Sequence, residues 1–159
     1  MSMEDLSSVL WRERELLETL LFKLEVEQLV LATGRTRWLA PAAREIEEVL
    51  DAVRETELLR SLTADAVALE LGLDPNPSLR DIADACDEPW RSIWLDHREA
   101  FTTVAAQITR LSESNRELLT AGYQAAQATL LSLSESSGTY GSDGSVASSR
   151  RSALVDRSL

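Results

Sequence analysis

The stretch of residues 90–133 constrains the fold more than any other part of the chain. Apolar and aromatic residues recur there in alternating steps of four and three, on two seams of a heptad. One seam is Trp90, His97, Val104, Leu111, Leu118 and Ala125, and the other is Trp94, Phe101, Ile108, Asn115, Gly122 and Thr129. A 3.5-residue period held over this length predicts one long helix packed along partner helices. Both seams end in small or polar residues, so the apolar contact weakens toward the C-terminus.

Two more long helices are predicted before this stretch. Leucines repeating at seven predict a first helix over residues 2–32, which Gly34 ends because glycine accepts a left-handed cap. The repeating leucines are Leu10, Leu17, Leu24 and Leu31. The opposite face is expected to be a solvated acidic surface made of Glu13, Glu18, Glu25 and Glu27.

The second helix is expected to become regular at Pro41, after an irregular turn through Trp38, and to end at Gly72. Its apolar stripe is expected to rotate near Thr56, as a stutter does in a coiled coil. The stripe is Ile46, Val49, Leu50 and Val53 before that point, and Leu58, Leu59, Leu62, Ala66 and Leu69 after it.

A short helix should follow, because Ser78 and Asp81 have the spacing of a capping box. Pro89, preceded by two acidic residues, is a suitable start for the long helix. The composition becomes rich in Ser and Gly from Ser134, which favours a flexible tail. The predicted domains are a helical domain over 1–135 and a flexible tail over 136–159.

These elements predict an all-α fold. It is an elongated antiparallel helical bundle or coiled coil of three long helices plus one short connecting helix, with a flexible C-terminal tail. If the chain runs up, down and up again, Trp11 lies near Trp90 or Trp94, and Trp38 lies at the other end.

Composition and charge exclude several classes of partner. The net charge of −11 repels nucleic acid and anionic membrane surfaces, so neither is expected to bind. The acidic N-terminus does not resemble a secretion signal, and no apolar run approaches the roughly 18 residues of a membrane span. We therefore expect a cytoplasmic protein without membrane insertion.

Residues suited to catalysis or metal binding are scarce. The chain has one His and one Cys, too few for a disulfide, a thiolate metal cluster or a di-iron site. His97 lies on a buried seam, so it is interpreted as a satisfied core histidine. The Trp residues are interpreted as core anchors. We expect no enzyme activity, no metal and no cofactor.

The end of the long helix is the candidate binding surface. If the first helix and the long helix have the same rise per residue, residue 112 lies level with the end of the first helix. Residues 113–133 would then extend beyond the hairpin formed by the first two helices. This part still carries exposed leucines, which indicates a partner surface. Its candidate binding residues are Asn115, Leu118, Leu119, Gly122, Tyr123, Ala126, Leu130 and Leu133. Homodimerisation, or a fold-back that covers the leucines, explains the pattern without binding of a different protein.

Asn115 has two interpretations. A polar residue on a heptad seam fixes the register of the paired helices at some cost in stability, and we prefer this interpretation. Alternatively, Asn115 marks the point where the bundle gives way to a binding face.

The chain resembles the FlgN family of flagellar export chaperones over about residues 5–135. The resemblance rests on the order and spacing of several segments. They are Ala32-Thr33-Gly34, Glu70-Leu71-Gly72-Leu73, Trp90-Arg91-Ser92-Ile93-Trp94 and the run from Leu111 through Asn115 to Leu118-Leu119. Many members have a second Asn and a Gly soon after the first Asn, whereas Arg116 and Glu117 follow here.

The resemblance implies a cytoplasmic chaperone for type III export. Its clients would be hook-associated proteins of the hook–filament junction, of the FlgK and FlgL type, bound through their C-terminal helical segments so that they do not assemble early. It would deliver them to the flagellar type III export apparatus. The family's C-terminal client-binding region maps onto Leu118, Leu119, Tyr123, Leu130 and Leu133. The alternative is a coiled-coil adaptor or dimerisation module with no role in export.

Overall fold

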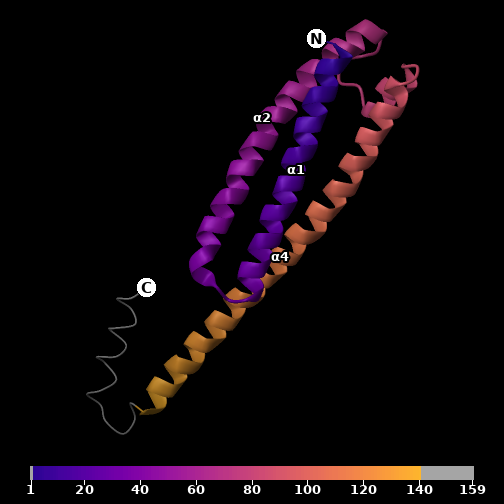
Figure 1. Cartoon of the computed structure of the whole chain (residues 1–159). Helices are drawn as coiled ribbons and strands as arrows, with labels where there is room; N and C mark the ends of the chain where they lie inside the picture. Colours follow the sequence, from indigo (N-terminus) through magenta and orange to yellow (C-terminus); the bar gives the residue numbers. More distant parts are fainter. Residues whose placement is uncertain (1, 141–159) are drawn as a thin grey trace. The chain divides into compact units, whose positions relative to one another are not determined.

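The fold consists of helices throughout the part of the chain that the structure describes, residues 2–140 of a computed structural model. The elements are α1 (Met3–Ala32), the 3-10 helix η1 (Thr36–Trp38), α2 (Leu39–Leu71), α3 (Leu79–Asp84) and α4 (Trp90–Tyr140) (Figure 1). No strand occurs among these residues, so the all-α prediction is confirmed. The chain divides into unit 1 (Met1–Arg116) and unit 2 (Glu117–Leu159), and α4 contributes to both.

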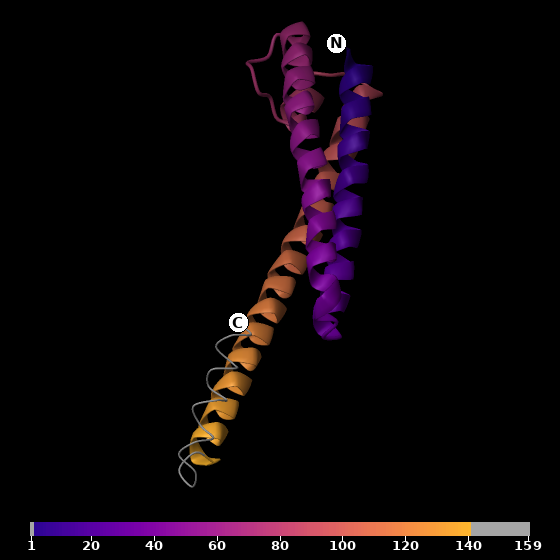
Figure 2. The ribbon, with the colours of Figure 1, turned by 90° about the vertical axis from the view of Figure 1, so that its left-hand side faces the viewer.

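Helices α1 and α2 form an antiparallel hairpin in unit 1 (Figures 1 and 2). Ion pairs join them at two levels: Arg60 Nη1 lies 3.2 Å from Glu13 Oε2, and Lys23 Nζ lies 3.1 Å from Glu45 Oε2. As the residue number rises on α1, it falls on α2. The predicted first hairpin is therefore present.

Side-chain caps and glycines define the ends of the helices, and those at Gly34, Gly72 and Ser78 are as predicted. Ser2 and Asp5 form a reciprocal capping box at the start of α1, which satisfies backbone N–H groups that have no partner within the helix. A second capping box joins Ser78 and Asp81 at the start of α3. Gly34 and Gly72 take φ values of +67° and +71°, the left-handed region where a side chain is unfavourable. Both predicted stops are confirmed.

The turn between α1 and α2 is irregular, as predicted, but it ends sooner. The 3-10 helix η1 covers the turn, and α2 begins at Leu39 rather than at Pro41. Pro41 is tolerated because it lies in the first turn of α2, where backbone N–H groups have no acceptor within the helix.

The predicted rotation of the α2 stripe near Thr56 is wrong. The buried side continues straight through Thr56, Thr63 and Val67, and Ala68 is also buried. The leucines predicted to form the second stripe, Leu58, Leu59, Leu62 and Leu69, are exposed. The two threonines can occupy the interior because each hydroxyl donates to a carbonyl of its own helix, at Ala52 and Leu59, respectively.

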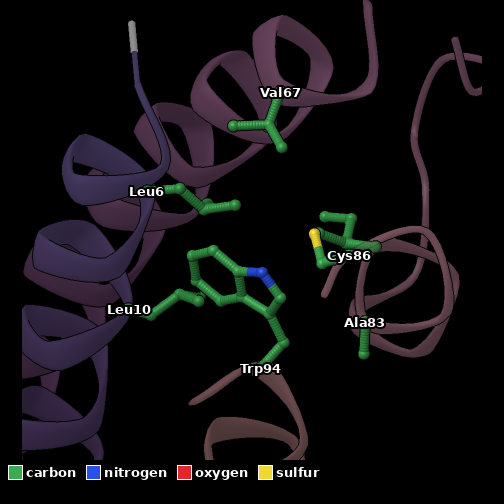
Figure 3. Close-up of a cluster of buried hydrophobic side chains, with 7 residues drawn as sticks. Leu6, Leu10, Val67, Ala83, Cys86 and Trp94 are labelled. Carbon is green, nitrogen blue, oxygen red and sulfur yellow. The ribbon is translucent and has the colours of Figure 1, made fainter. Parts of the chain in front are cut away.

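The hydrophobic core of unit 1 lies around the indole of Trp94 (Figure 3). Trp94 is fully buried between leucines of α1 and the residues of α3 and the loop after it. The buried cluster is Leu6, Leu10, Val67, Ile82, Ala83, Cys86 and Trp94. Trp94 is a core anchor as predicted, and Trp90 stacks on it at 5.1 Å between ring centroids. Trp11 and Trp38 are about half exposed, so the interpretation of all Trp residues as core anchors is wrong for these two.

Within unit 1, α4 runs parallel to α1. Arg14 Nη1 lies 3.0 Å from Asp96 Oδ2, and Gln28 Nε2 donates to Ser114 Oγ at 3.0 Å. Contact with α1 therefore continues a few residues farther along α4 than equal rise predicts. The ring of His97 lies 5.1 Å from that of Trp11.

The Trp residues follow the predicted path of the chain. The ring of Trp94 lies 6.3 Å from that of His97, so Trp11 and Trp94 share one end of the unit. Trp38 lies in the turn at the opposite end of the hairpin.

Helix α4 begins after Pro89, as predicted. Its first turn is capped by Glu88, whose carboxylate accepts hydrogen bonds from the N–H and the hydroxyl of Ser92. The helix continues to Tyr140, beyond its predicted end near Leu133. Residues 134–140, assigned by composition to the start of a flexible region, are therefore helical. The rest of the predicted tail, 141–159, lies outside the described residues.

Candidate helix-binding surface

Exposed apolar side chains follow one another along α4 in unit 2. From Leu119 to residue 138 every side chain is exposed. The large apolar ones are Leu119 (51%), Tyr123 (65%), Leu130 (47%), Leu131 (65%) and Leu133 (62%). Monomeric soluble proteins rarely expose large contiguous apolar patches, and such patches mark interaction sites.

The predicted binding residues in unit 2 share one side of the helix. At 3.6 residues per turn, they fall within an arc of about 140°. These residues, which we call the unit 2 face, are Leu118, Leu119, Gly122, Tyr123, Ala126, Leu130 and Leu133. Leu118 is half-buried and the other large side chains are exposed. The structure therefore brings this part of the predicted site together on one surface.

Charge is missing from this part of α4. No Asp, Glu, Lys or Arg occurs between Glu117 and Glu135. Solvated helices normally carry charged residues on their outer face, and a helix without them is typical of buried or partner-covered segments. This gap was available in the sequence and indicates the surface more directly than the heptad pattern does.

Internal packing among the described residues does not require a glycine at position 122. A Cβ atom built at this position meets nothing within 4 Å, so a side chain would fit. Glycine in the middle of a helix costs about 1 kcal/mol relative to alanine. A small residue that is not required by internal packing, next to Ala126 on the same side, is suited to the close approach of a second helix.

Polar side chains of unit 2 use their own helix as partner. Gln127 Nε2 donates to the Tyr123 hydroxyl at 3.0 Å, and the Thr129 hydroxyl donates to the Ala125 carbonyl at 2.9 Å. These groups therefore need little from a ligand. What the surface offers is apolar contact, with the Tyr123 O–H as one hydrogen-bond donor.

Asn115 differs from the other predicted binding residues, because it is buried in unit 1. Its Nδ2 donates to the Leu24 carbonyl at 2.9 Å and to Glu27 Oε1 at 3.0 Å, so both hydrogens join α4 to α1. This is the contact expected of a residue that fixes helix register. Asn115 is therefore an interior contact, and the exposed surface begins after it.

The acidic face of α1 is only partly solvated. Glu18 and Glu25 are exposed, but the Glu13 side chain is 4% exposed and pairs with Arg60. Burial raises the pKa of Glu13, and the nearby Arg60 charge opposes that rise. The prediction of a solvated surface is wrong for Glu13, which lies three residues after Leu10 and four before Leu17, in the middle of the leucine stripe.

His97 is buried in the core, as predicted, but it is not fully satisfied, because its buried Nε2 has no hydrogen-bond partner among the described residues. Its Nδ1 lies 3.3 Å from Arg14 Nη1, and a guanidinium only donates, so Nδ1 is the acceptor. Burial lowers the pKa of His97, the Arg14 charge lowers it further, and Asp96 acts in the opposite direction. The contact holds α1 against α4 near Trp11.

The described residues offer neither a metal site nor a membrane span. None of their His, Cys, Asp and Glu side chains form a group of three or more that could hold a metal ion. None of the helices in residues 2–140 is both long and apolar enough to cross a membrane.

The fold and the unit 2 face define an all-helical binding protein, with a closed core in unit 1 and an uncovered apolar surface in unit 2. The family model described as FlgN protein matches residues 1–148. The chain therefore belongs to the FlgN family, a family of flagellar type III export chaperones that bind export substrates and not a family of enzymes. No curated protein and no solved structure matches it.

Proposed function

We propose that this chaperone escorts hook-associated proteins of the hook–filament junction, the FlgK and FlgL type, and binds their C-terminal helical segments on the unit 2 face. In this role it acts in the cytoplasm, prevents early assembly of the client and delivers it to the flagellar type III export apparatus. The observation that carries the proposal is the uncharged, exposed face between Glu117 and Glu135.

The chemistry of this face fits an amphipathic helix. Leucines and Tyr123 supply apolar area, and covering one such side chain stabilises a complex by about 1.5–3 kcal/mol. Gly122 and Ala126 leave room for the client backbone to approach between them. Helix-in-groove recognition uses anchors at this spacing, so the client is expected to present its own leucines at three- and four-residue intervals.

The test compares two matched double variants of the full chain. Leu119→Asp with Leu130→Asp changes two exposed leucines of unit 2, and Leu58→Asp with Leu69→Asp changes two exposed leucines of unit 1. Binding to purified C-terminal segments of hook-associated proteins is measured by calorimetry. The unit 2 variant should bind about a hundredfold more weakly or worse, because each change loses apolar burial and adds a charge that must be desolvated. The unit 1 variant should bind normally.

The competing function is self-association through the same face, as in a coiled-coil dimerisation module. Sedimentation velocity separates the two. A monomer that binds the client supports the chaperone proposal. A dimer that becomes monomeric in the Leu119→Asp, Leu130→Asp variant, with no effect of that variant on client binding, would support the dimerisation module.

A further inference from the structure

A second exposed apolar stripe lies on α2, in unit 1. Leu58, Leu62 and Leu69 are 71%, 60% and 82% exposed, and none of them belongs to the hydrophobic core cluster or packs against it. At 1.5 Å per residue the stripe is about 16 Å long, the length of three helical turns. It lies in the other unit from the unit 2 face and is separate from it in sequence.

The distribution of side chains on α2 is the reverse of what burial alone would favour. Thr56 and Thr63 face inward and are 3% and 2% exposed, whereas the leucines face solvent. Burying a leucine is worth about 1.5–3 kcal/mol, and threonine offers less apolar area. The interior of unit 1 therefore leaves these leucines outside, as apolar area that none of the described residues of unit 1 covers.

Acidic residues flank the stripe on the same side of α2. Glu55 lies about one turn before Leu58, and Asp65 lies between Leu62 and Leu69. Asp51 lies about two turns before Leu58, where its carboxylate pairs with Arg54 at 2.8 Å. The net charge of the chain is −11. A second copy would bring like charges together on both sides of the contact, which disfavours a dimer through this face.

Two exposed aromatic residues of α1, Trp11 and Phe22, have cationic neighbours. On α1 the Arg14 guanidinium lies 4.2 Å from the centroid of the Trp11 ring, and Lys23 Nζ lies 5.7 Å from that of Phe22. No such cation–π contact involves aliphatic side chains, so the α2 leucines have neither core packing nor this kind of cover. Of the two helices, α2 therefore carries the stripe that is more in need of a partner.

We infer that the stripe of Leu58, Leu62 and Leu69 is a second docking site, distinct from the unit 2 face, for a basic amphipathic helix of another protein. Leucines on the partner cover the stripe, and Lys or Arg residues on both of its edges face the carboxylates of α2. Electrostatic attraction of this kind speeds encounter and selects basic over acidic partners. The two surfaces share no residue.

The probe is a fluorescein-labelled helical peptide with leucines at the spacing of Leu58, Leu62 and Leu69 and with lysines at the flanking positions. Its twin has glutamates in place of the lysines. Anisotropy with the full chain should show binding of the basic peptide and at least about tenfold weaker binding of the acidic peptide. Raising the salt concentration should weaken binding of the basic peptide, because salt screens charges that are exposed to solvent.

Matched variants locate the binding. The double variant Leu58→Gln, Leu62→Gln should bind the basic peptide about tenfold more weakly or worse. The double variant Leu119→Gln, Leu131→Gln in unit 2 should bind it as tightly as the wild type does. Glu55→Gln should reduce the salt dependence. Circular dichroism should show the same helix content in every variant, because all of these residues are exposed.

Three results would overturn the inference. The first is equal binding of the basic and acidic peptides, and the second is unchanged binding in the Leu58→Gln, Leu62→Gln variant. The third is a wild-type dimer that this variant converts to a monomer, since a second copy would then be the occupant. None of these results bears on client binding by unit 2, so the two proposals can fail separately.

Discussion

Units 1 and 2 distribute charge and apolar area in opposite ways. Unit 1 encloses a core around Trp94 and places Arg60 against the buried Glu13. Unit 2 has no charge from Leu118 to Ser134 and leaves its leucines exposed. In our proposal, unit 1 supplies the stability of the fold and unit 2 supplies the contact with a client. The same helix, α4, serves both purposes because its sequence changes composition near Arg116.

Core truncation in unit 1 should have the largest effect. Trp94→Ala removes the side chain around which the core is packed, so the free energy of unfolding should fall by about 3–5 kcal/mol. Leu131→Ala in unit 2 should change it by no more than about 0.5 kcal/mol. Urea unfolding followed by circular dichroism measures both. Equal losses would show that unit 2 is as well packed as unit 1.

The pair formed by Glu13 and Arg60 gives the next effect. Arg60→Ala leaves a buried carboxylate without its partner, which should cost about 1–3 kcal/mol. Glu13→Gln removes the buried charge and should be less destabilising than Arg60→Ala. Thermal melts of the two variants provide the comparison. If Glu13→Gln were the more damaging change, the ion pair would stabilise unit 1 more than burial destabilises it.

Acid should weaken unit 1 through His97. The pKa of this residue is lowered in the fold from its ordinary value of 6.5, so the unfolded chain takes up a proton before the folded chain does. The contribution of neutral His97 to the free energy of unfolding is therefore fully present above pH 6.5. It is lost as the pH falls through the pKa of His97 in the folded protein. Urea unfolding between pH 7.5 and pH 5.5 measures the loss.

His97→Gln is the control for this prediction and should flatten the pH dependence in that range. Glu13 acts with the opposite sign at lower pH, because its raised pKa favours the protonated side chain in the fold. An unchanged slope in His97→Gln would assign the pH dependence to other groups.

Much of the fold could be predicted because local chemistry decides it. Gly34 and Gly72 stop helices through their backbone freedom, and Ser2 and Ser78 start them through side-chain hydrogen bonds. These effects involve residues only a few positions apart, so they can be recognised without knowing the tertiary structure.

The wrong predictions concern which face of a helix is buried. Helix α2 carries apolar residues at helical spacing on two sides, and periodicity does not tell which side meets α1. Periodicity therefore predicts Leu58 on a packed stripe and does not predict Thr63 in the interior, whereas Leu58 is exposed and Thr63 is buried. Asn115 lies on a seam that is buried at that point, although the same seam is exposed two turns later, at Gly122. Where α4 ceases to be covered depends on the register between α1 and α4, which is a tertiary contact.

The smallest predicted effect concerns Gly122. Gly122→Ala should stabilise the helix locally by about 1 kcal/mol, since a Cβ meets nothing there, and amide exchange in unit 2 should slow about fivefold. The same change should weaken client binding, because the methyl group keeps the client backbone at a greater distance. Stronger client binding in this variant would show that helix order, and not close approach, limits the affinity.

The most direct test of the central claim is amide hydrogen exchange of the full chain with and without the C-terminal helical segment of a hook-associated protein. We predict slower exchange over residues 118–133 in the complex and unchanged exchange over residues 58–69 of α2. Protection confined to unit 1, with residues 118–133 exchanging as fast as in the free protein, would contradict the account.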